Sequence, residues 1–327
     1  MEEFKQFADH LGERILIVGH QNADPDALGA AQGVKELILK LNPSIIAEIV
    51  LPEDTSLITL NVASSLGLEI KAIETMPNPD TIVIVDTGGT NQLGGWWQRI
   101  SKENVQIIFI DHHLPDSEIL QLSNLYIIDP DATSTSEMVY QLMKTYNLTP
   151  SKKTASALLA GITFDTRHFS IGGTNTFSVA SELLEVTGDI SEVKELLILP
   201  MGESEKIARL KAGQRADITQ IGEWLISTSQ LSSFQSSGAR ALVSLGADLA
   251  VVAGEVDNEV RASMRSTSQF YRSTLLHLGD FCYELAKFFN GSGSGHPTAA
   301  GLKCSVDLDS FIEETKKQLE EELSQRT

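Results

Sequence analysis

Three polar residues that can bind a metal ion or a phosphate, Asp111, His112 and His113, directly follow the apolar run 105–110. A nearly continuous run of Val, Ile and Leu is typical of a buried parallel strand. Open α/β sheets place their chemistry just beyond the carboxyl ends of such strands. Adjacent histidines also occur on ordinary surface turns, so the triplet indicates a site only if other strands end in the same way.

Other predicted elements do end in this way. Two further apolar runs, 14–18 and 81–85, and a small-residue helix predicted over 154–164 are each closely followed by a carboxylate or an imidazole. The candidate site residues are, in chain order, His20, Asp24, Asp26, Asp86, Asp111, His112, His113 and Asp165. Because parallel strands end at one edge of a sheet, we expect these side chains to lie together.

Several carboxylates held this close would repel one another and shift one another's pKa values. Divalent cations are the natural remedy, and histidine and carboxylate ligands without thiolate favour manganese or magnesium over structural zinc. Two such ions about 3.5–4 Å apart can clamp the attacking and leaving oxygens of a phosphoryl displacement. The pattern therefore predicts a two-metal centre.

Each residue also has a simpler interpretation when it is taken alone. Asp26 could cap the following helix, and Asp86 could belong to a turn. Asp165 could be an isolated helix-terminal carboxylate, and His20 could be a hydrogen-bonded loop residue. Their recurrence at the ends of successive elements favours the metal centre over four separate explanations.

Composition limits the class of protein. The chain has 327 residues, which is enough for two domains with separate cores. A hydrophobic content of 42% and a charged content of 21% indicate an ordinary globular protein. The net charge of −19 disfavours long nucleic acids, whose phosphate backbones bind basic proteins.

The sequence also bears on location. No apolar run approaches the roughly 20 residues of a membrane span, and the acidic N-terminus lacks the pattern of a signal peptide. Cys282 and Cys304 provide neither a disulfide framework nor a metal-type spacing. We therefore expect a cytoplasmic protein with reduced thiols and no membrane partner.

Apolar runs alternate with helical patterns through the first half of the chain, which predicts a doubly wound, mainly parallel α/β sheet. The expected strands and helices there are 14–18, 27–41, 45–51, 81–85, 105–110, 134–145, 154–164 and 175–186. A charged helical stretch covers 192–220, and the Ala-, Val- and Leu-rich stretch 238–256 indicates a new sheet. We expect a catalytic metal-binding domain (1–188), a helical linker (189–222) and a smaller α/β substrate-binding domain (223–327).

Taken in order, these motifs resemble those of the DHH phosphoesterase family. The matching segments are His20-x-x-x-Asp24-x-Asp26, Asp86, Asp111-His112-His113 and Gly161-Ile162-Thr163-Phe164-Asp165-Thr166. The C-terminal segment Gly293-Ser294-Gly295-His296-Pro297-Thr298-Ala299-Ala300-Gly301 is similar to the Gly-Gly-Gly-His-x-x-Ala-Ala-Gly signature of the associated domain. That domain occurs in the oligoribonuclease/pAp-phosphatase (nanoRNase) and RecJ-like branches, whereas the DHH inorganic pyrophosphatases carry a different second domain. Pro25, Ala23 and Ser294 depart from the usual residues.

The resemblance implies a role for each site residue. It implies two divalent ions, most suitably manganese, with magnesium or cobalt as alternatives. The ligands would be His20, Asp24 and Asp86 for one ion and Asp26, Asp86, His112 and Asp165 for the other, with Asp86 bridging. His113 would face the scissile phosphate, and Asp111 would support the histidine pair. A hydroxide between the ions would attack phosphorus in line.

The second domain would bind the rest of the substrate. Residues 259–266 alternate, so Arg261, Ser263 and Arg265 would share one strand face. A solvated surface and a flexible Gly/Ser hinge are the simpler interpretations of this strand and of the Gly-rich segment. With the resemblance, Arg265 would hold a phosphate and the glycines would let the backbone approach a nucleotide. The implied substrate-binding residues are Arg261, Ser263, Arg265, Ser266, Gly293, Ser294, Gly295 and His296.

Two domains joined by a helical linker suggest a cleft whose width limits the length of the substrate. We therefore expect hydrolysis of very short oligonucleotides to mononucleotides, or of 3'-phosphoadenosine 5'-phosphate (pAp) to AMP, by a monomer or homodimer. The alternatives are a phosphodiesterase for dinucleotide signals such as c-di-AMP, pApA or pGpG, a RecJ-like single-strand exonuclease, and a non-catalytic nucleotide-binding protein.

Overall fold

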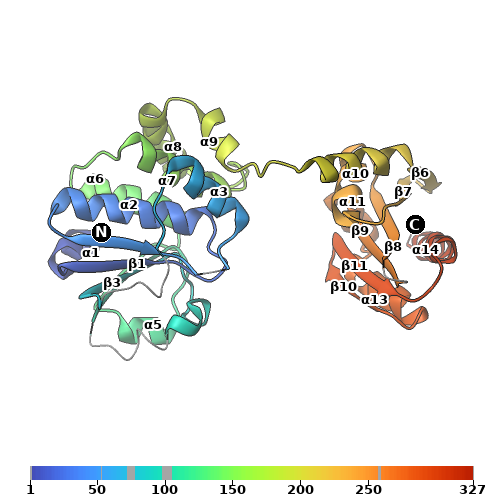
Figure 1. Ribbon diagram of the computed structural model, residues 1–327, viewed down its shortest axis with the longest axis horizontal. Coiled ribbons are helices and arrows are strands. Elements are labelled where there is room, and N and C mark those ends of the chain that lie inside the picture. The colour runs from blue at the N-terminus through green and yellow to red at the C-terminus, as the bar shows by residue number, and fades with distance from the viewer. Residues whose placement is uncertain (1, 53, 72–77, 98–104, 257–258, 327) are drawn as a thin grey trace. The chain divides into compact units, whose positions relative to one another are not determined.

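A computed structural model describes residues 2–52, 54–71, 78–97, 105–256 and 259–326 (Figure 1). Met1 and Thr327, the outer ends of the two expected domains, lie outside the described residues. The chain divides into two compact units, Met1–Leu199 and Pro200–Thr327. Each unit has its own sheet and its own core, so each is described by itself.

The first unit is an α/β unit around a five-stranded sheet. Its elements are α1 (Glu2–Gln6), η1 (Phe7–His10), β1 (Arg14–Val18), α2 (Pro25–Leu41), β2 (Ile46–Val50), α3 (Leu57–Leu66), β3 (Thr81–Val85), η3 (Thr90–Gln92), η4 (Gly94–Trp96), β4 (Gln106–Asp111), α5 (Ser117–Leu122), β5 (Leu125–Ile128), α6 (Thr135–Thr145), α7 (Lys152–Asp165), α8 (Thr174–Thr187) and α9 (Ile190–Leu196). The strand order is β2-β1-β3-β4-β5, and every pair is parallel. The predicted doubly wound parallel sheet is confirmed.

Alternate residues of the strands supply two apolar layers. Ile17 and Val83 belong to the larger core, which α2, α6 and α7 cover, whereas Val18 and Ile84 face the smaller core between the sheet and α5 (Figure 1). The strand order reverses between β1 and β3, and α/β sheets bind ligands at the carboxyl ends of the strands beside such a switch point. The fold thus directs attention to the residues that follow β1 and β3.

Side-chain caps fix where the helices around this edge begin. The Oδ1 atom of Asp24 accepts hydrogen bonds from the backbone N–H groups of Asp26 (2.8 Å) and Ala27 (3.1 Å), so Asp24 caps α2. Asp26 itself is the second residue of the helix, and the alternative in which it serves as the cap is wrong. Ser134 caps α6 by accepting a bond from the N–H of Glu137 at 3.1 Å.

The second unit holds a mixed six-stranded sheet. Its elements are α10 (Glu203–Gln214), β6 (Asp217–Ile221), β7 (Trp224–Gln230), α11 (Gln235–Ser244), β8 (Leu249–Val256), β9 (Glu259–Ser266), α12 (Ser268–Thr274), α13 (Leu278–Phe288), β10 (Ser292–His296), β11 (Ala299–Cys304) and α14 (Leu308–Ser324). The order is β10-β11-β9-β8-β7-β6, in which only β7 and β8 are parallel neighbours. α10 and α11 pack on one face, and α12, α13 and α14 pack on the other.

Three stretches differ from their expected structure. The stretch 192–220 is not one helix, because it contains the end of α9, then α10, then β6. β6 pairs with β7, so part of the expected linker belongs to the second sheet. The stretch 238–256 begins in α11 and only its end forms β8, since Ala- and Leu-rich sequence suits a buried helix as well as a strand.

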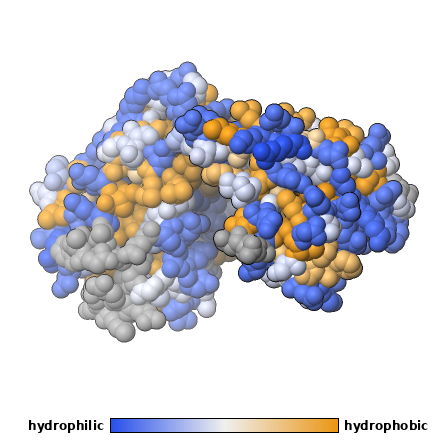
Figure 2. All heavy atoms as spheres, turned by 45° about the vertical axis from the view of Figure 1, so that its right-hand side comes forward, coloured by the Kyte–Doolittle hydropathy of each residue, from blue (hydrophilic) through white to orange (hydrophobic). Residues whose placement is uncertain are grey.

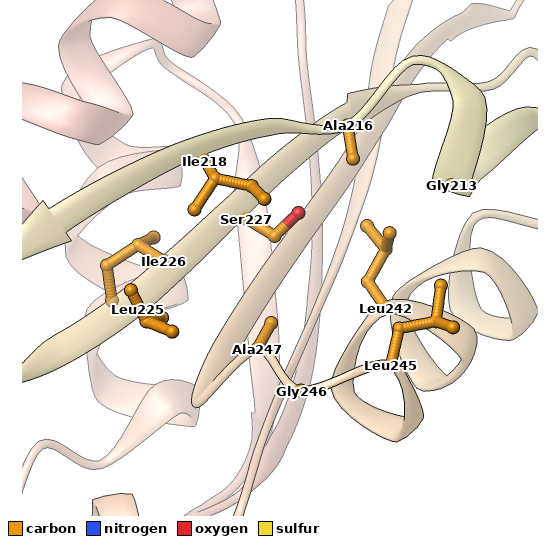
Figure 3. Close-up of a pocket in the computed structure, with 10 residues that line it drawn as sticks. All are labelled: Gly213, Ala216, Ile218, Leu225, Ile226, Ser227, Leu242, Leu245, Gly246 and Ala247. Atoms are coloured by element: carbon orange, nitrogen blue, oxygen red, sulfur yellow. The ribbon is translucent and has the colours of Figure 1, made fainter.

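The second unit also has a hollow of about 290 Å³ on the side of its sheet that carries α10 and α11. Figure 3 shows the apolar side chains of Ile218, Leu225, Leu242 and Leu245 around it. The hydroxyl of Ser227, which lines the hollow, is buried and has no hydrogen-bond partner among the described residues. None of the described residues that line the hollow has a cationic side chain, so this lining does not have the character of a phosphate site.

Hydrophilic residues are spread over the visible face of each unit, with hydrophobic residues among them (Figure 2). Within the residues that the structure describes, no helix is both long and apolar enough to cross a membrane. The two cysteines, Cys282 and Cys304, are buried as free thiols in the second unit.

Candidate metal centre

The first unit brings its candidate residues to the carboxyl ends of the central strands. His20 follows β1, Asp86 follows β3 directly, and Asp111 is the last residue of β4. The N-terminus of α2 supplies Asp24 and Asp26, and the last residue of α7 is Asp165. The structure therefore places all eight predicted residues of this unit at one edge of the sheet, next to the switch point.

The potential ligand atoms form overlapping groups, in each of which they lie within 4.8 Å of one another. The groups are His20, Asp24 and Asp86; Asp26, His112 and Asp165; and Asp86, Asp111, His112 and His113. Asp86 stands between the two sides, because its Oδ2 atom lies 3.7 Å from Nε2 of His20 and its Oδ1 atom lies 3.6 Å from Nε2 of His112.

Backbone carbonyl groups set the orientation of two histidines. Nδ1 of His20 lies 2.6 Å from the carbonyl oxygen of Gln21, and Nδ1 of His112 lies 3.3 Å from that of Ala132. A histidine that donates from Nδ1 presents the lone pair of Nε2 to a metal ion. Nε2 of His112 is buried without a hydrogen-bond partner among the described residues and lies 3.4 Å from Oδ2 of Asp165. This donor set fits divalent cations with mixed nitrogen and oxygen ligands.

Buried negative charge dominates the electrostatics of the centre. Burial and the neighbouring carboxylates raise the pKa of Asp26 to about 7 and raise that of Asp86 well above its usual value. Burial opposes charge on His112, but the carboxylate of Asp165, 3.4 Å from Nε2, and the other carboxylates around the ring outweigh this effect and raise its pKa to about 9. Such a centre holds positive charge tightly, as a proton or as a metal ion.

Asp111 is fully buried and connects two strand ends. Its Oδ2 atom accepts a hydrogen bond from the N–H of Thr87 at 3.1 Å. Its Oδ1 atom accepts from the N–H of His113 at 3.0 Å and lies 2.9 Å from Nδ1 of the same residue. The ring of His113 is thereby fixed while its side chain stays 53% exposed.

A strained turn follows Asp165. Arg167, His168 and Phe169 have φ values of 50°, 58° and 62°, a left-handed conformation that side chains other than glycine rarely adopt. The N–H of His168 donates to the carbonyl of Thr163 at 2.7 Å, and the N–H of Phe169 donates to the hydroxyl of Thr166 at 3.0 Å. Arg167 and His168 are exposed at this turn, directly after a candidate ligand.

In the second unit the structure groups most of the predicted substrate-binding residues on one sheet face. Arg261, Ser263 and Arg265 of β9 alternate with Val260, Ala262 and Met264, which belong to the core under α13. Ser294 and His296 of β10 are exposed. Because the side chains of a strand alternate, Ser266 faces the opposite way from Arg265, and its hydroxyl is buried without a partner among the described residues.

Arg265 combines neutral contacts with an unbalanced charge. Its guanidinium donates to the hydroxyl of Ser236 at 2.7 Å and to the carbonyl of Met264 at 2.8 Å. Burial and the nearby charge of Arg240 lower its pKa. These two acceptors and the carbonyl of Ala300, at 3.4 Å, are the acceptors found among the described residues, and all three are neutral, so the positive charge of the guanidinium is available to an anion.

The glycines of the Gly-rich strand serve packing within the unit. A Cβ atom on Gly293 would lie 2.3 Å from the carbonyl oxygen of Cys282, and one on Gly295 would lie 2.5 Å from that of Ala299. Gly279 of α13 has the same restriction against the carbonyl oxygen of Gly295, at 2.4 Å. Close approach of α13 and β10 therefore explains Gly279 and Gly293, close approach of β11 explains Gly295, and no nucleotide is needed to explain these glycines.

Sequence reasoning missed some neighbours of both sites. Thr135 and Ser136, in the first turn of α6, donate hydrogen bonds to Asp26 and Asp86. These contacts could have been expected from the sequence. Ser134 is a typical first residue of a helix, and the N-terminus of a helix attracts carboxylates. Lys303 of β11 is exposed and pairs in register with Arg261. Only the strand register reveals this third cation.

The fold and the donor groups define a class, namely an α/β protein with a histidine and carboxylate centre suited to divalent cations at its switch point. The chain belongs to the DHH family of phosphoesterases. Residues 14–162 match the model of the DHH family, N-terminal domain. That match covers most of the first unit, ends before Asp165, and does not extend to the Gly-rich strand of the second unit.

Relatives agree with this membership. The chain is 34% identical to an uncharacterized protein, MJ0988, of Methanocaldococcus jannaschii, over 94% of this chain and 92% of the relative. It is 30% identical to a probable bifunctional oligoribonuclease and PAP phosphatase, NrnA, of Streptococcus mutans, over 88% of this chain and 89% of the relative. The fold is similar to the crystal structure of an exopolyphosphatase-related protein from Bacteroides fragilis, with a TM-score of 0.58, 18% identity and coverage of 99% and 98%.

Proposed function

We propose that the protein is a metal-dependent phosphoesterase that hydrolyses very short oligonucleotides to mononucleotides, pAp to AMP, or both. The observation that supports this most strongly is the position of Asp86 between His20 and His112, at the junction of two donor groups. A relative of similar length is named as an oligoribonuclease and PAP phosphatase, which favours the same substrates.

We assign His20, Asp24 and Asp86 to one cation and Asp26, Asp86, His112 and Asp165 to a second cation. Manganese suits these ligands best, and magnesium and cobalt are alternatives. When bound, the cations would supply charge neutralisation at the phosphate and a lowered pKa for water at the site.

His113 would bind the scissile phosphate. Asp111 engages Nδ1 of this histidine, so Nε2 is the ring nitrogen left for a phosphate oxygen. The side chain is 53% exposed, which lets a substrate reach it. Asp111 acts in this proposal as a positioning residue, because it holds the ring and does not contact the substrate.

The second unit would bind the remainder of a short substrate through its cationic sheet face. The cations are Arg261, Arg265 and Lys303 on the sheet face and Arg240 of α11, whose charge lies near Arg265, and Ser263, Ser294 and His296 would add hydrogen bonds. A guanidinium can bind one phosphate group bidentately. The net charge of −19 confines favourable binding to such local sites, so it favours short substrates over long strands.

Substrate length provides the test. Purified protein with Mn²⁺ is assayed on pApA, pAp, c-di-AMP and a single-stranded DNA of about 24 nucleotides at low and moderate salt. We expect turnover of pApA, pAp or both at a rate at least about tenfold above that of the long strand. Asp86→Ala, which removes the shared ligand, is the inactive control.

Three results would contradict the proposal. Degradation of the long strand as fast as of pApA would indicate a processive exonuclease. Turnover of c-di-AMP well above that of pApA and pAp would indicate a phosphodiesterase for cyclic dinucleotides. Binding without turnover of any of the four substrates would indicate a nucleotide-binding protein.

A further inference from the structure

We propose that the first turn of α6 prepositions the metal ligands, and that Thr135 is the positioning residue that fixes Asp86 relative to Asp26. The inference rests on the proposed metal-dependent function. It concerns residues that do not themselves belong to the ligand set. Thr135 is fully buried and contacts both carboxylates, one through its backbone and the other through its side chain.

The backbone of α6 grips both oxygens of Asp26. The N–H of Thr135 donates to Oδ2 at 2.7 Å, and the N–H of Ser136 donates to Oδ1 at 2.9 Å. These are the free donors of the first helical turn, and they carry the positive end of the helix dipole. Two bonds to two oxygens fix the plane of the carboxylate, which one bond would leave free to rotate.

The side chain of Thr135 secures Asp86. Its hydroxyl donates to Oδ1 of Asp86 at 3.0 Å. Asp86 has a φ of 54°, a strained conformation for a residue other than glycine. Such conformations persist only where the surroundings determine them. Here the N–H of Asp86 donates to the carbonyl of Ile110 at 3.0 Å, and Thr135 holds the other end of the residue.

Two glycines make room for this contact. A Cβ atom on Gly161 of α7 would lie 2.4 Å from the hydroxyl oxygen of Ser136 and 2.8 Å from Oδ1 of Asp26. A Cβ atom on Gly29 of α2 would lie 2.6 Å from the same hydroxyl. A larger residue at position 161 or at position 29 would displace the N-terminus of α6 from the carboxylates. Three helices thus contribute to one arrangement of α6, Asp26 and Asp86.

Glu137 anchors the same turn from its other side. Its Oε2 atom accepts a bond from the hydroxyl of Thr133 at 2.8 Å, and its Oε1 atom accepts from Nδ2 of Asn175 at 2.6 Å. Glu137 is buried, so these bonds are shielded from water. The turn is therefore tied to α8 as well as to the ligands, which gives it a fixed position before any ion binds.

The arrangement has a measurable consequence for metal affinity. Without the Thr135 hydroxyl, Asp86 loses a donor and the spacing of the two carboxylates is no longer fixed. Removal of such an outer hydrogen bond typically lowers metal affinity by about 10–100-fold. Thr135→Val keeps the size and the backbone bonds to Asp26 and removes only the hydroxyl. Thr135→Ser keeps the hydroxyl.

The test is a titration of metal-stripped protein with Mn²⁺, followed by calorimetry, with no substrate present. We expect Thr135→Val to weaken binding about tenfold or more, and Thr135→Ser to bind within about threefold of wild type. Thr187→Val is the matched control, because its buried hydroxyl has no partner among the described residues. It should bind as wild type does. Wild-type affinity in Thr135→Val would overturn the inference.

Two further measurements keep the result clear. If Thr135→Val does not fold by circular dichroism, Thr135→Cys, which is similar in size and is a weak donor, takes its place and should bind more weakly than Thr135→Ser. The proposed function is tested by a different result. If the wild-type protein binds Mn²⁺ but hydrolyses none of the four substrates, the proposed activity is refuted and the positioning role of Thr135 is not.

Discussion

At the scale of single residues, the centre depends on groups that are held in place before a ligand arrives. Carbonyl oxygens hold Nδ1 of His20 and His112, so both Nε2 atoms face the carboxylates. Asp111 holds His113 in the same manner. The identity of these residues could be predicted from the spacing of His and Asp in the sequence. Their orientation could not, because it depends on carbonyl groups such as that of Ala132, 20 residues away from His112.

The pKa values predict how pH affects the metal-free protein. Burial raises the pKa of Asp26 to about 7, above its unfolded value, so this group costs stability as pH rises from about 4 to 7. The pKa of His112 is raised to about 9, so its stabilising charge is present below about 6.5 and lost as pH rises through 9. Both effects make the metal-free protein less stable at higher pH.

Metal binding should reverse this trend. Binding requires an ionised Asp26 and a neutral His112, so the affinity should rise as their protons leave. We expect the increase in Tm that Mn²⁺ produces to be larger at about pH 8 than at about pH 6. Differential scanning calorimetry with and without Mn²⁺ measures this. Asp26→Asn is the control and should show a smaller dependence, while an increase in Tm that is equal at both pH values would contradict the account.

At the scale of elements, the sequence was informative where local pattern decides the structure. Apolar runs predicted β1, β3 and β4, and runs of small residues predicted α2 and α7. The local sequence pattern did not predict elements whose structure depends on contacts with residues far away in the chain. β10 reads Ser-Gly-Ser-Gly-His and has no strand signal, but it pairs with β11 and packs on α13. The contacts of α6 with Asp26 and Asp86 join residues 109 and 49 positions apart, which no local pattern shows.

The left-handed turn after Asp165 carries a prediction about stability. Each residue other than glycine in this conformation costs about 1–2 kcal/mol. Arg167 has a φ of 50° and an exposed side chain, so Arg167→Gly should raise the free energy of unfolding by about 0.5–1 kcal/mol after the flexibility of glycine in the unfolded chain is counted. Urea denaturation measures the change.

Asn147→Gly is the matched control for this turn. Asn147 also has a positive φ, of 55°, but asparagine tolerates that conformation better than arginine does. The gain at Asn147 should therefore be smaller than the gain at Arg167. A destabilising Arg167→Gly would show that the Arg167 side chain contributes more to the folded state than its exposed position indicates.

At the scale of the whole molecule, the account gives the two units separate tasks. The first unit contains the candidate metal centre, and the second presents cations on a sheet face. Length predicted room for two domains, and the net charge of −19 disfavoured long nucleic acids. These properties could not show that the chain divides between Leu199 and Pro200 or that β6 belongs to the second sheet, because these depend on the packing of α10 against α11 and on the pairing of β6 with β7.

This division of tasks is testable through Arg265. Arg265→Ala should raise KM for pAp or pApA by about tenfold or more, since a charged hydrogen bond to phosphate contributes about 1.5–3 kcal/mol. The affinity for Mn²⁺ should not change. Steady-state kinetics and the metal titration provide the two readings. An unchanged KM, or a weakened affinity for Mn²⁺, would remove Arg265 from the substrate-binding role.

The central claim is that two cations share Asp86. The most direct measurement is the anomalous scattering of manganese in crystals of the protein grown with Mn²⁺. The account predicts two peaks about 3.5–4 Å apart, one beside His20 and Asp24 and the other beside His112 and Asp165, with Asp86 contacting both. A single peak, or two peaks of which only one contacts Asp86, would contradict it.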